Sequence, residues 1–159
     1  MSCNSVSPEK CFDIAVLNSN MLVGFANRGL LRELESPSVK MSGTGSETVA
    51  MTRSDVVQSK VDFVEANLKK LQGLKKTEDT REMLQASLAL HEYILPIYKT
   101  EYQQLAKLYD EGASEESIQV QGQAIHDKHA IKFDELYNNL ISLGKLFAER
   151  HNIKVNWGS

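Results

Sequence analysis

A single helical periodicity runs without interruption from Ser114 to His151, and it constrains the fold more than any other stretch of the chain. Mostly apolar residues recur there at steps of three and four, the spacing that places them on one face of an α-helix. The positions on this face are Ile118, Gly122, Ile125, His129, Phe133, Leu136, Leu140, Leu143 and Phe147. Ser114, followed by two glutamates, is a typical helix start because its hydroxyl accepts a free backbone N–H. A helix this long has to bury its apolar face against other helices.

Three further helical segments are predicted before this one. The first begins at Ser7-Pro8-Glu9 and is expected to continue to about Leu34. The second opens with a capping box of Thr44 and Glu47, and its apolar face continues to Leu71. The third begins after a Thr77 cap and is expected to reach Tyr109 or Glu111. These segments predict an all-α protein.

The connections between the predicted helices are mostly short, which favours an up-down-up-down antiparallel four-helix bundle. We expect a tether over residues 1–7 and one helical domain over residues 8–159. Residues 36–46 are rich in serine and glycine, so they are expected to form a flexible connector, with a contact surface as the alternative. A tail after His151 is expected to fold back, with Trp157 covering the end of the bundle.

Pro96 lies inside the third predicted helix. A proline there removes one backbone hydrogen bond and frees the carbonyl group of residue i−4, which is Glu92. The apolar periodicity continues on both sides of Pro96, so a kink is predicted rather than the end of the helix.

The charge balance and the lack of long apolar runs limit the classes of partner. The chain carries 18 Lys and Arg against 21 Asp and Glu, a net charge of −3, which does not favour binding to nucleic acid. No apolar run approaches the roughly 20 residues that cross a bilayer. Membrane contact is therefore expected only through a lipid.

A candidate site for that lipid is Cys3. It follows a small residue, Ser2, and precedes a short polar stretch and a helical domain. This plan resembles uncharacterised helical surface lipoproteins of the bacterial envelope. The resemblance implies lipid attachment at Cys3 and a periplasmic or outer-surface location. The alternative is an incidental cysteine near a chain end, in a cytoplasmic protein.

The histidines raise the possibility of a metal site. His126 and His129 are three residues apart on one helix, a spacing that lets two imidazoles bind one ion, with His91 as a third ligand. Antiparallel pairing of the last two helices offsets His91 from His129 by about five residues, or about 7 Å. A structural role for His129 therefore competes with metal binding: its imidazole would donate to the carbonyl that Pro96 frees. His126 is expected near solvent, and no cofactor is expected.

Four tyrosines recur along the third helix: Tyr93, Tyr98, Tyr102 and Tyr109. They either belong to the core, with hydroxyl groups reaching its rim, or line a groove for a partner.

The sequence has no Gly-x-Ser-x-Gly elbow, no phosphate-binding loop with a trailing Lys and Ser or Thr, and no haem motif. We therefore expect a non-catalytic helical bundle that acts by contact with a protein or ligand. A protein partner is favoured, and a second copy of the chain is among the candidates. The alternative function is a bundle that binds a metal or small ligand through inward histidines.

Overall fold

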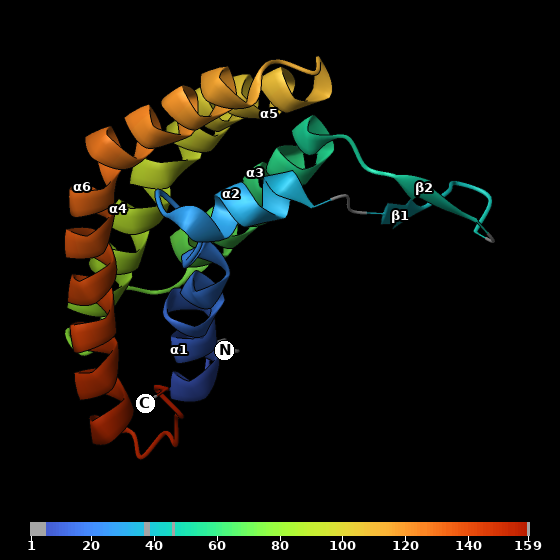
Figure 1. The fold of residues 1–159 in the computed structure, drawn as a ribbon. Helices are drawn as coiled ribbons and strands as arrows, with labels where there is room; N and C mark the ends of the chain where they lie inside the picture. The colour runs from blue at the N-terminus through green and yellow to red at the C-terminus, as the bar shows by residue number, and fades with distance from the viewer. Residues whose placement is uncertain (1–5, 37–38, 46, 159) are drawn as a thin grey trace.

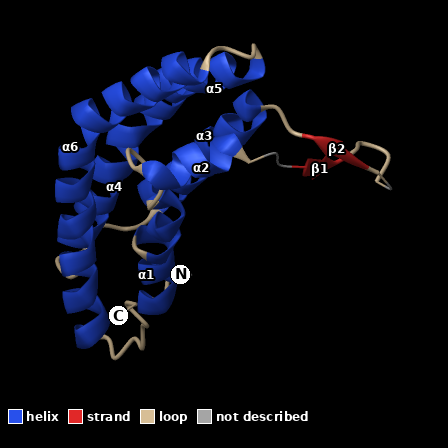
Figure 2. Ribbon diagram, viewed as in Figure 1, coloured by secondary structure: helices blue, strands red, loops and turns tan. Residues whose placement is uncertain are grey.

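The computed structural model describes residues 6–36, 39–45 and 47–158. Its described part is helical apart from one small sheet, which confirms the all-α prediction in outline (Figures 1 and 2). The helices are α1 (Pro8–Ala15), η1 (Leu17–Leu22), α2 (Arg28–Glu35), α3 (Arg53–Gly73), α4 (Arg81–Ile97), η2 (Tyr98–Tyr102), α5 (Gln103–Asp110) and α6 (Glu115–Arg150). No helix in these ranges is both long enough and apolar enough to cross a membrane.

The predicted continuous helix over residues 8–34 is wrong. The segment is divided into α1, the 3₁₀-helix η1 and α2, with a tight reversal between η1 and α2. Two glycines allow this reversal: a Cβ atom on Gly24 would lie 3.1 Å from the backbone nitrogen of Leu30, and one on Gly29 would lie 3.0 Å from Cα of Gly24. Ala26 has a left-handed φ of 53°, and its N–H donates to the Tyr102 hydroxyl at 2.8 Å. A contact from the third predicted helix thus holds the reversal in place.

The second predicted helix starts later than its proposed capping box. Residues 39–50 instead contain β1 (Val39–Met41) and β2 (Thr48–Ala50), an antiparallel pair in which Lys40 faces Val49. The part of the expected flexible connector that is described therefore includes a strand. Helix α3 begins at Arg53, where Thr52 and Asp55 form the capping box. Asp110 of α5 reinforces this start, since its carboxylate accepts the backbone N–H groups of Arg53 and Ser54 at 2.8 and 3.0 Å.

The helical path does not end at Pro96. It continues from α4 into η2, a short π-helix, and then into α5. Pro96 and Glu92 are both exposed, so the carbonyl group that the proline frees lies on the solvent side of the helix. It does not need a buried donor, which explains why the predicted role for His129 is not seen.

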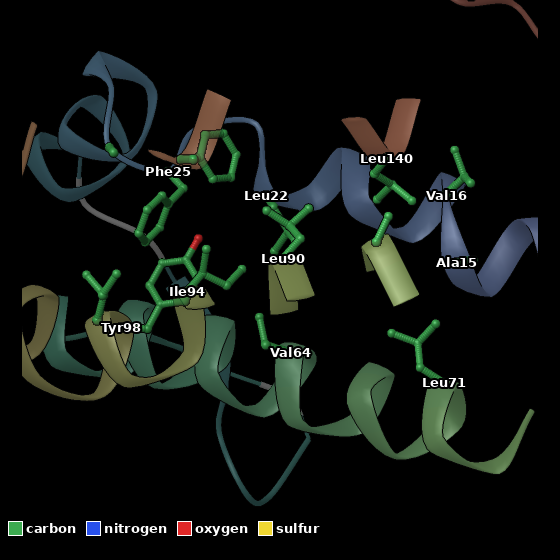
Figure 3. Packing of buried hydrophobic residues seen from close by; sticks show 14 of the residues in the cluster. Ala15, Val16, Leu22, Phe25, Val64, Leu71, Leu90, Ile94, Tyr98 and Leu140 are labelled. Atoms are coloured by element: carbon green, nitrogen blue, oxygen red, sulfur yellow. The ribbon is translucent and has the colours of Figure 1, made fainter. Parts of the chain in front are cut away.

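The core forms where α3 and α4 pack together and where α1 and α6 close over them. Figure 3 shows side chains from these elements facing one another, with Ala15 and Val16 at one end and Phe25 and Tyr98 at the other. Helices α1 and α6 approach closely at Gly144, where an added Cβ atom would lie 2.9 Å from a methyl group of Val16.

The C-terminal tail folds back onto α1, as predicted for Trp157. The Trp157 ring meets Phe12 edge-on at 5.9 Å between centroids, and Lys145 lies 5.5 Å from the centre of the indole. Asp79, in the turn before α4, accepts from Arg150 at 3.0 Å and lies 2.5 Å from the His151 ring nitrogen. Hydrogen bonding to His151 holds the pKa of Asp79 below its ordinary value. The end of α6 is thereby attached to the turn between α3 and α4.

Candidate interaction surface

Exposed apolar side chains are grouped on the β-hairpin arm, defined here as residues 39–45 and 47–50. It projects away from the helices, and all six residues of its strands are exposed (Figure 1). Residues paired across an antiparallel ladder share a face, and side chains alternate along a strand. Val39, Met41, Thr48 and Ala50 therefore share one face, on which Val39 is 64% and Met41 62% exposed. This face of the arm is thus uncharged and mainly apolar, with Thr48 as its one polar residue, and none of the described helices covers it.

The opposite face of the arm is held by an ion pair. The Lys40 ammonium group lies 2.8 Å from the carboxylate of Asp55, in the first turn of α3. The hydrogen bond from Lys40 lowers the pKa of Asp55, so this carboxylate is ionised at neutral pH. Because the same carboxylate closes the α3 capping box, the direction of the arm is linked to the start of α3.

A groove of about 420 Å³ lies beside the base of the arm, between η1, α2 and α3. Its apolar lining is Met21, Leu22, Met51, Val56 and Phe63. Met51 directly follows β2, so the groove begins where the arm ends. One ion pair crosses the lining, with Lys60 Nζ 2.7 Å from the Glu33 carboxylate. Methionine suits such a surface because its flexible thioether adapts to different shapes.

His129 lies on the buried face of α6, but its polar partners differ from the one predicted. Its Nδ1 is 2.8 Å from the Tyr93 hydroxyl, and its Nε2 contacts the Glu101 carboxylate in η2. The second Glu101 oxygen accepts from Lys128 at 2.6 Å. Both ring nitrogens of His129 therefore have a polar partner, the Glu101 carboxylate at Nε2 and the Tyr93 hydroxyl at Nδ1. The group links α4, η2 and α6, and burial raises the pKa of Tyr93, which opposes use of its oxygen as a base.

His91 lies in a separate buried network at the end of α1. Its Nδ1 lies 2.7 Å from the Ser87 carbonyl oxygen and its Nε2 2.9 Å from the Asn67 amide nitrogen. Asn67 also donates to the Ile14 carbonyl at 3.1 Å, and the Ser87 hydroxyl donates to the Ala15 carbonyl at 2.7 Å. These are carbonyl groups at the end of α1, where the α-helical bonding stops. Burial lowers the pKa of His91, and the network therefore holds a neutral imidazole.

The three histidines proposed as metal ligands are not brought together. His126 is exposed, with Asp127 at 3.3 Å as its nearest acid, while His91 and His129 have the separate partners described above. Within residues 6–36, 39–45 and 47–158, no group of three or more His, Cys, Asp or Glu side chains has the arrangement of a metal site.

The tyrosines do not line one groove. Tyr98 and Tyr102 are buried in the core, where both rings pack against Phe25, and burial raises the pKa of Tyr102 to about 12. Tyr93 belongs to the His129 group. Tyr109 is partly buried, and its burial raises its pKa.

The proposed lipid site, Cys3, lies outside the described residues. Cys11 is a free cysteine and is buried in α1, as expected for a small apolar side chain, and burial raises the pKa of its thiol.

Sequence reasoning missed both the arm and the groove. The only local signal for the arm was the alternation of Val39, Lys40 and Met41 before a glycine-containing turn, which is shorter than a usual strand pattern. The chain was compared with models of known families, with curated proteins and with solved structures, and none of the three comparisons gives a match.

Proposed function

We propose that this chain is a non-catalytic binding protein that contacts another protein through the arm and the groove. The observation that carries the proposal is the mainly apolar face of the arm, which none of the described helices covers (Figure 1). Fully burying a valine or methionine side chain is worth about 1.5–3 kcal/mol, so a partner gains by covering this face. A two-stranded hairpin alone is at best marginally stable in water, so a partner would also stabilise the arm.

A photo-crosslinking residue in place of Met41 tests the proposal in cells. The matched control carries the same residue in place of Ile131, which is 76% exposed on α6. We expect discrete protein adducts from position 41 and none of the same mass from position 131. Mass spectrometry of the adducts identifies the partner, whether a different protein or the same chain. Equal adducts at both positions, or none at position 41, would contradict the function.

We infer an antiparallel four-helix plan for the body, with the divided N-terminal segment in the place of the first helix. The packing of α4 against both α3 and α6 supports it. We also infer a bend at Pro96, supported by the π-helical turn that follows. Spin labels on exposed positions of α4 and α5 measure this bend, and Pro96→Ala is expected to lengthen the distance between them.

We propose that a lipid on Cys3 places the chain at a membrane surface of the bacterial envelope. The cysteine after a small residue and the polar stretch before α1 support this proposal. Metabolic labelling with an alkyne fatty acid, in bacteria that express the natural gene, tests it. The label is expected on the wild type and not on Cys3→Ala. An unlabelled wild type would contradict the anchor and leave the binding function untouched.

A further inference from the structure

We propose that the partner is a second copy of this chain, with the arm of each copy lying in the groove of the other. The inference rests on the proposed function, because it names the partner of the same arm and groove. The strongest argument is the match between the two surfaces in polarity, charge and position.

The two surfaces are compatible in charge, because neither of them presents a charged group without a partner. The apolar face of the arm carries no ionisable side chain, and Lys40 lies on the opposite face with Asp55 as its partner. Among the described residues, the charged side chains that line the groove are Glu33 and Lys60, which form an ion pair. An occupant with one charged group facing the groove would bury that charge against methionine and phenylalanine without a partner, at a large desolvation cost. The arm avoids this cost.

The position of the arm allows a symmetric exchange. The arm and the groove are adjacent, since Met51 directly follows the arm and lines the groove, yet the arm projects away from its own helices (Figure 1). A two-fold axis that places one arm in the groove of the other copy also places the second arm in the first groove. Both apolar surfaces of both copies are then covered in one closed dimer.

The surface area that the dimer buries sets its expected affinity. An arm with three-residue strands about 10 Å long and about 5 Å apart, lengthened by its turn and widened by its side chains, presents a face on the order of 200 Å². Two arms and two grooves then bury on the order of 800 Å², which is below the roughly 1,200 Å² of a standard stable interface. The exchange is therefore expected to give a reversible dimer with a dissociation constant in the micromolar to millimolar range.

Analytical ultracentrifugation of the purified full chain from about 1 μM to about 1 mM tests the dimer, with this range set by the expected affinity. The weight-average mass is expected to rise from 17.8 kDa towards twice that value. Met41→Asp in the arm and Met21→Asp in the groove should each weaken the dimer at least tenfold. Ile131→Asp should leave it unchanged. All three side chains are more than half exposed, so circular dichroism and the melting temperature should match the wild type.

A mixture of the arm variant and the groove variant separates exchange from other modes of dimerisation. Each variant alone has no intact arm-in-groove contact, whereas a mixed dimer keeps one. The mixture should therefore associate more strongly than either variant alone. A mixture no stronger than the separate variants would overturn the exchange, and so would a wild type that stays monomeric at 1 mM. If position 41 then crosslinks to a different protein in cells, the binding function stands and only the identity of the partner is wrong.

Discussion

At the scale of single residues, the buried polar groups are concentrated where a helix ends inside the protein. The carbonyl groups of Ile14 and Ala15 lack helical partners there, and Asn67 and Ser87 donate to them. His91 completes the arrangement by accepting from Asn67. An unsatisfied buried carbonyl group costs about 1–3 kcal/mol, so these side chains have a direct role in stability.

The network predicts a pH dependence of stability. Burial lowers the pKa of His91 in the folded chain, whereas the unfolded chain keeps the ordinary value of about 6.5. Below that value the unfolded state binds more protons, so the contribution of His91 to the free energy of unfolding is intact above pH 6.5 and falls as the pH decreases. Urea denaturation between pH 7.5 and 5 should show a shallower decrease for His91→Gln than for the wild type. Ile131→Ala, at an exposed position without an ionisable side chain, should keep the wild-type slope. Equal slopes for His91→Gln and the wild type would show that His91 does not titrate in this way.

At the scale of elements, close helix packing depends on small residues at particular positions. Gly144 of α6 faces Val16 and Phe12, whereas Gly73, the last residue of α3, has no neighbouring atom within 4 Å of an added Cβ. Gly144 is therefore required for the close packing of α6 against α1, whereas Gly73 is not required for any helix contact. The two positions can be compared directly.

Substitution of each glycine by alanine distinguishes these roles. Gly144→Ala places a methyl group 2.9 Å from Val16, and overpacking of this kind costs about 1–3 kcal/mol, against a helix-propensity gain of about 1 kcal/mol. We expect net destabilisation. Gly73→Ala should stabilise the protein by about 0.5–1 kcal/mol. Thermal unfolding of both variants provides the measurement, and a Gly144→Ala protein at least as stable as the wild type would contradict the packing assigned to α1 and α6.

The elements also show what sequence could and could not predict. The periodicity located α6 and the bodies of α3 and α4, and Ser7 and Ser114 are the caps expected at their helices. These signals are local. The break after α1 could not be predicted, because it depends on the contact of Ala26 with Tyr102, which is 76 positions away.

The same dependence on contacts between distant residues explains why the candidate site could not be predicted in full. The burial of His129 followed from its place on the apolar face, but its partner Glu101 is brought to it by the π-helical turn after Pro96, which leaves no mark in the periodicity. The arm depends on strands of three residues, too short for their alternation to stand out from chance.

At the scale of the whole molecule, the arm and the body are separable. The ends of the arm are close together, since the Arg53 side chain donates to the carbonyl oxygen of Leu34 at 2.9 Å. The buried core residues come from the helices and from residues that directly adjoin them, and none comes from the described residues of the arm.

Replacement of residues 37–51 by a short Gly-Ser linker tests this separation. Because every strand residue of the arm is exposed, the free energy of unfolding should change by less than about 1 kcal/mol. The variant should lose the dimer expected of the intact chain. Chemical denaturation monitored through Trp157, the only tryptophan, follows the body alone. A loss of several kcal/mol would show that the arm belongs to the folded core.

The network at the end of α1 also limits how the helices are able to slide past one another. If α1 moved by one turn along α3 and α4, Val16 and Phe12 would leave Gly144, and the Ile14 and Ala15 carbonyl groups would lose Asn67 and Ser87 together. Apolar contacts alone tolerate such a shift, because one valine or leucine replaces another at similar cost. Polar contacts do not, because a buried carbonyl group that loses its donor is left without a hydrogen bond. The buried amide and hydroxyl groups thus select one alignment of the helices from several that are nearly as well packed.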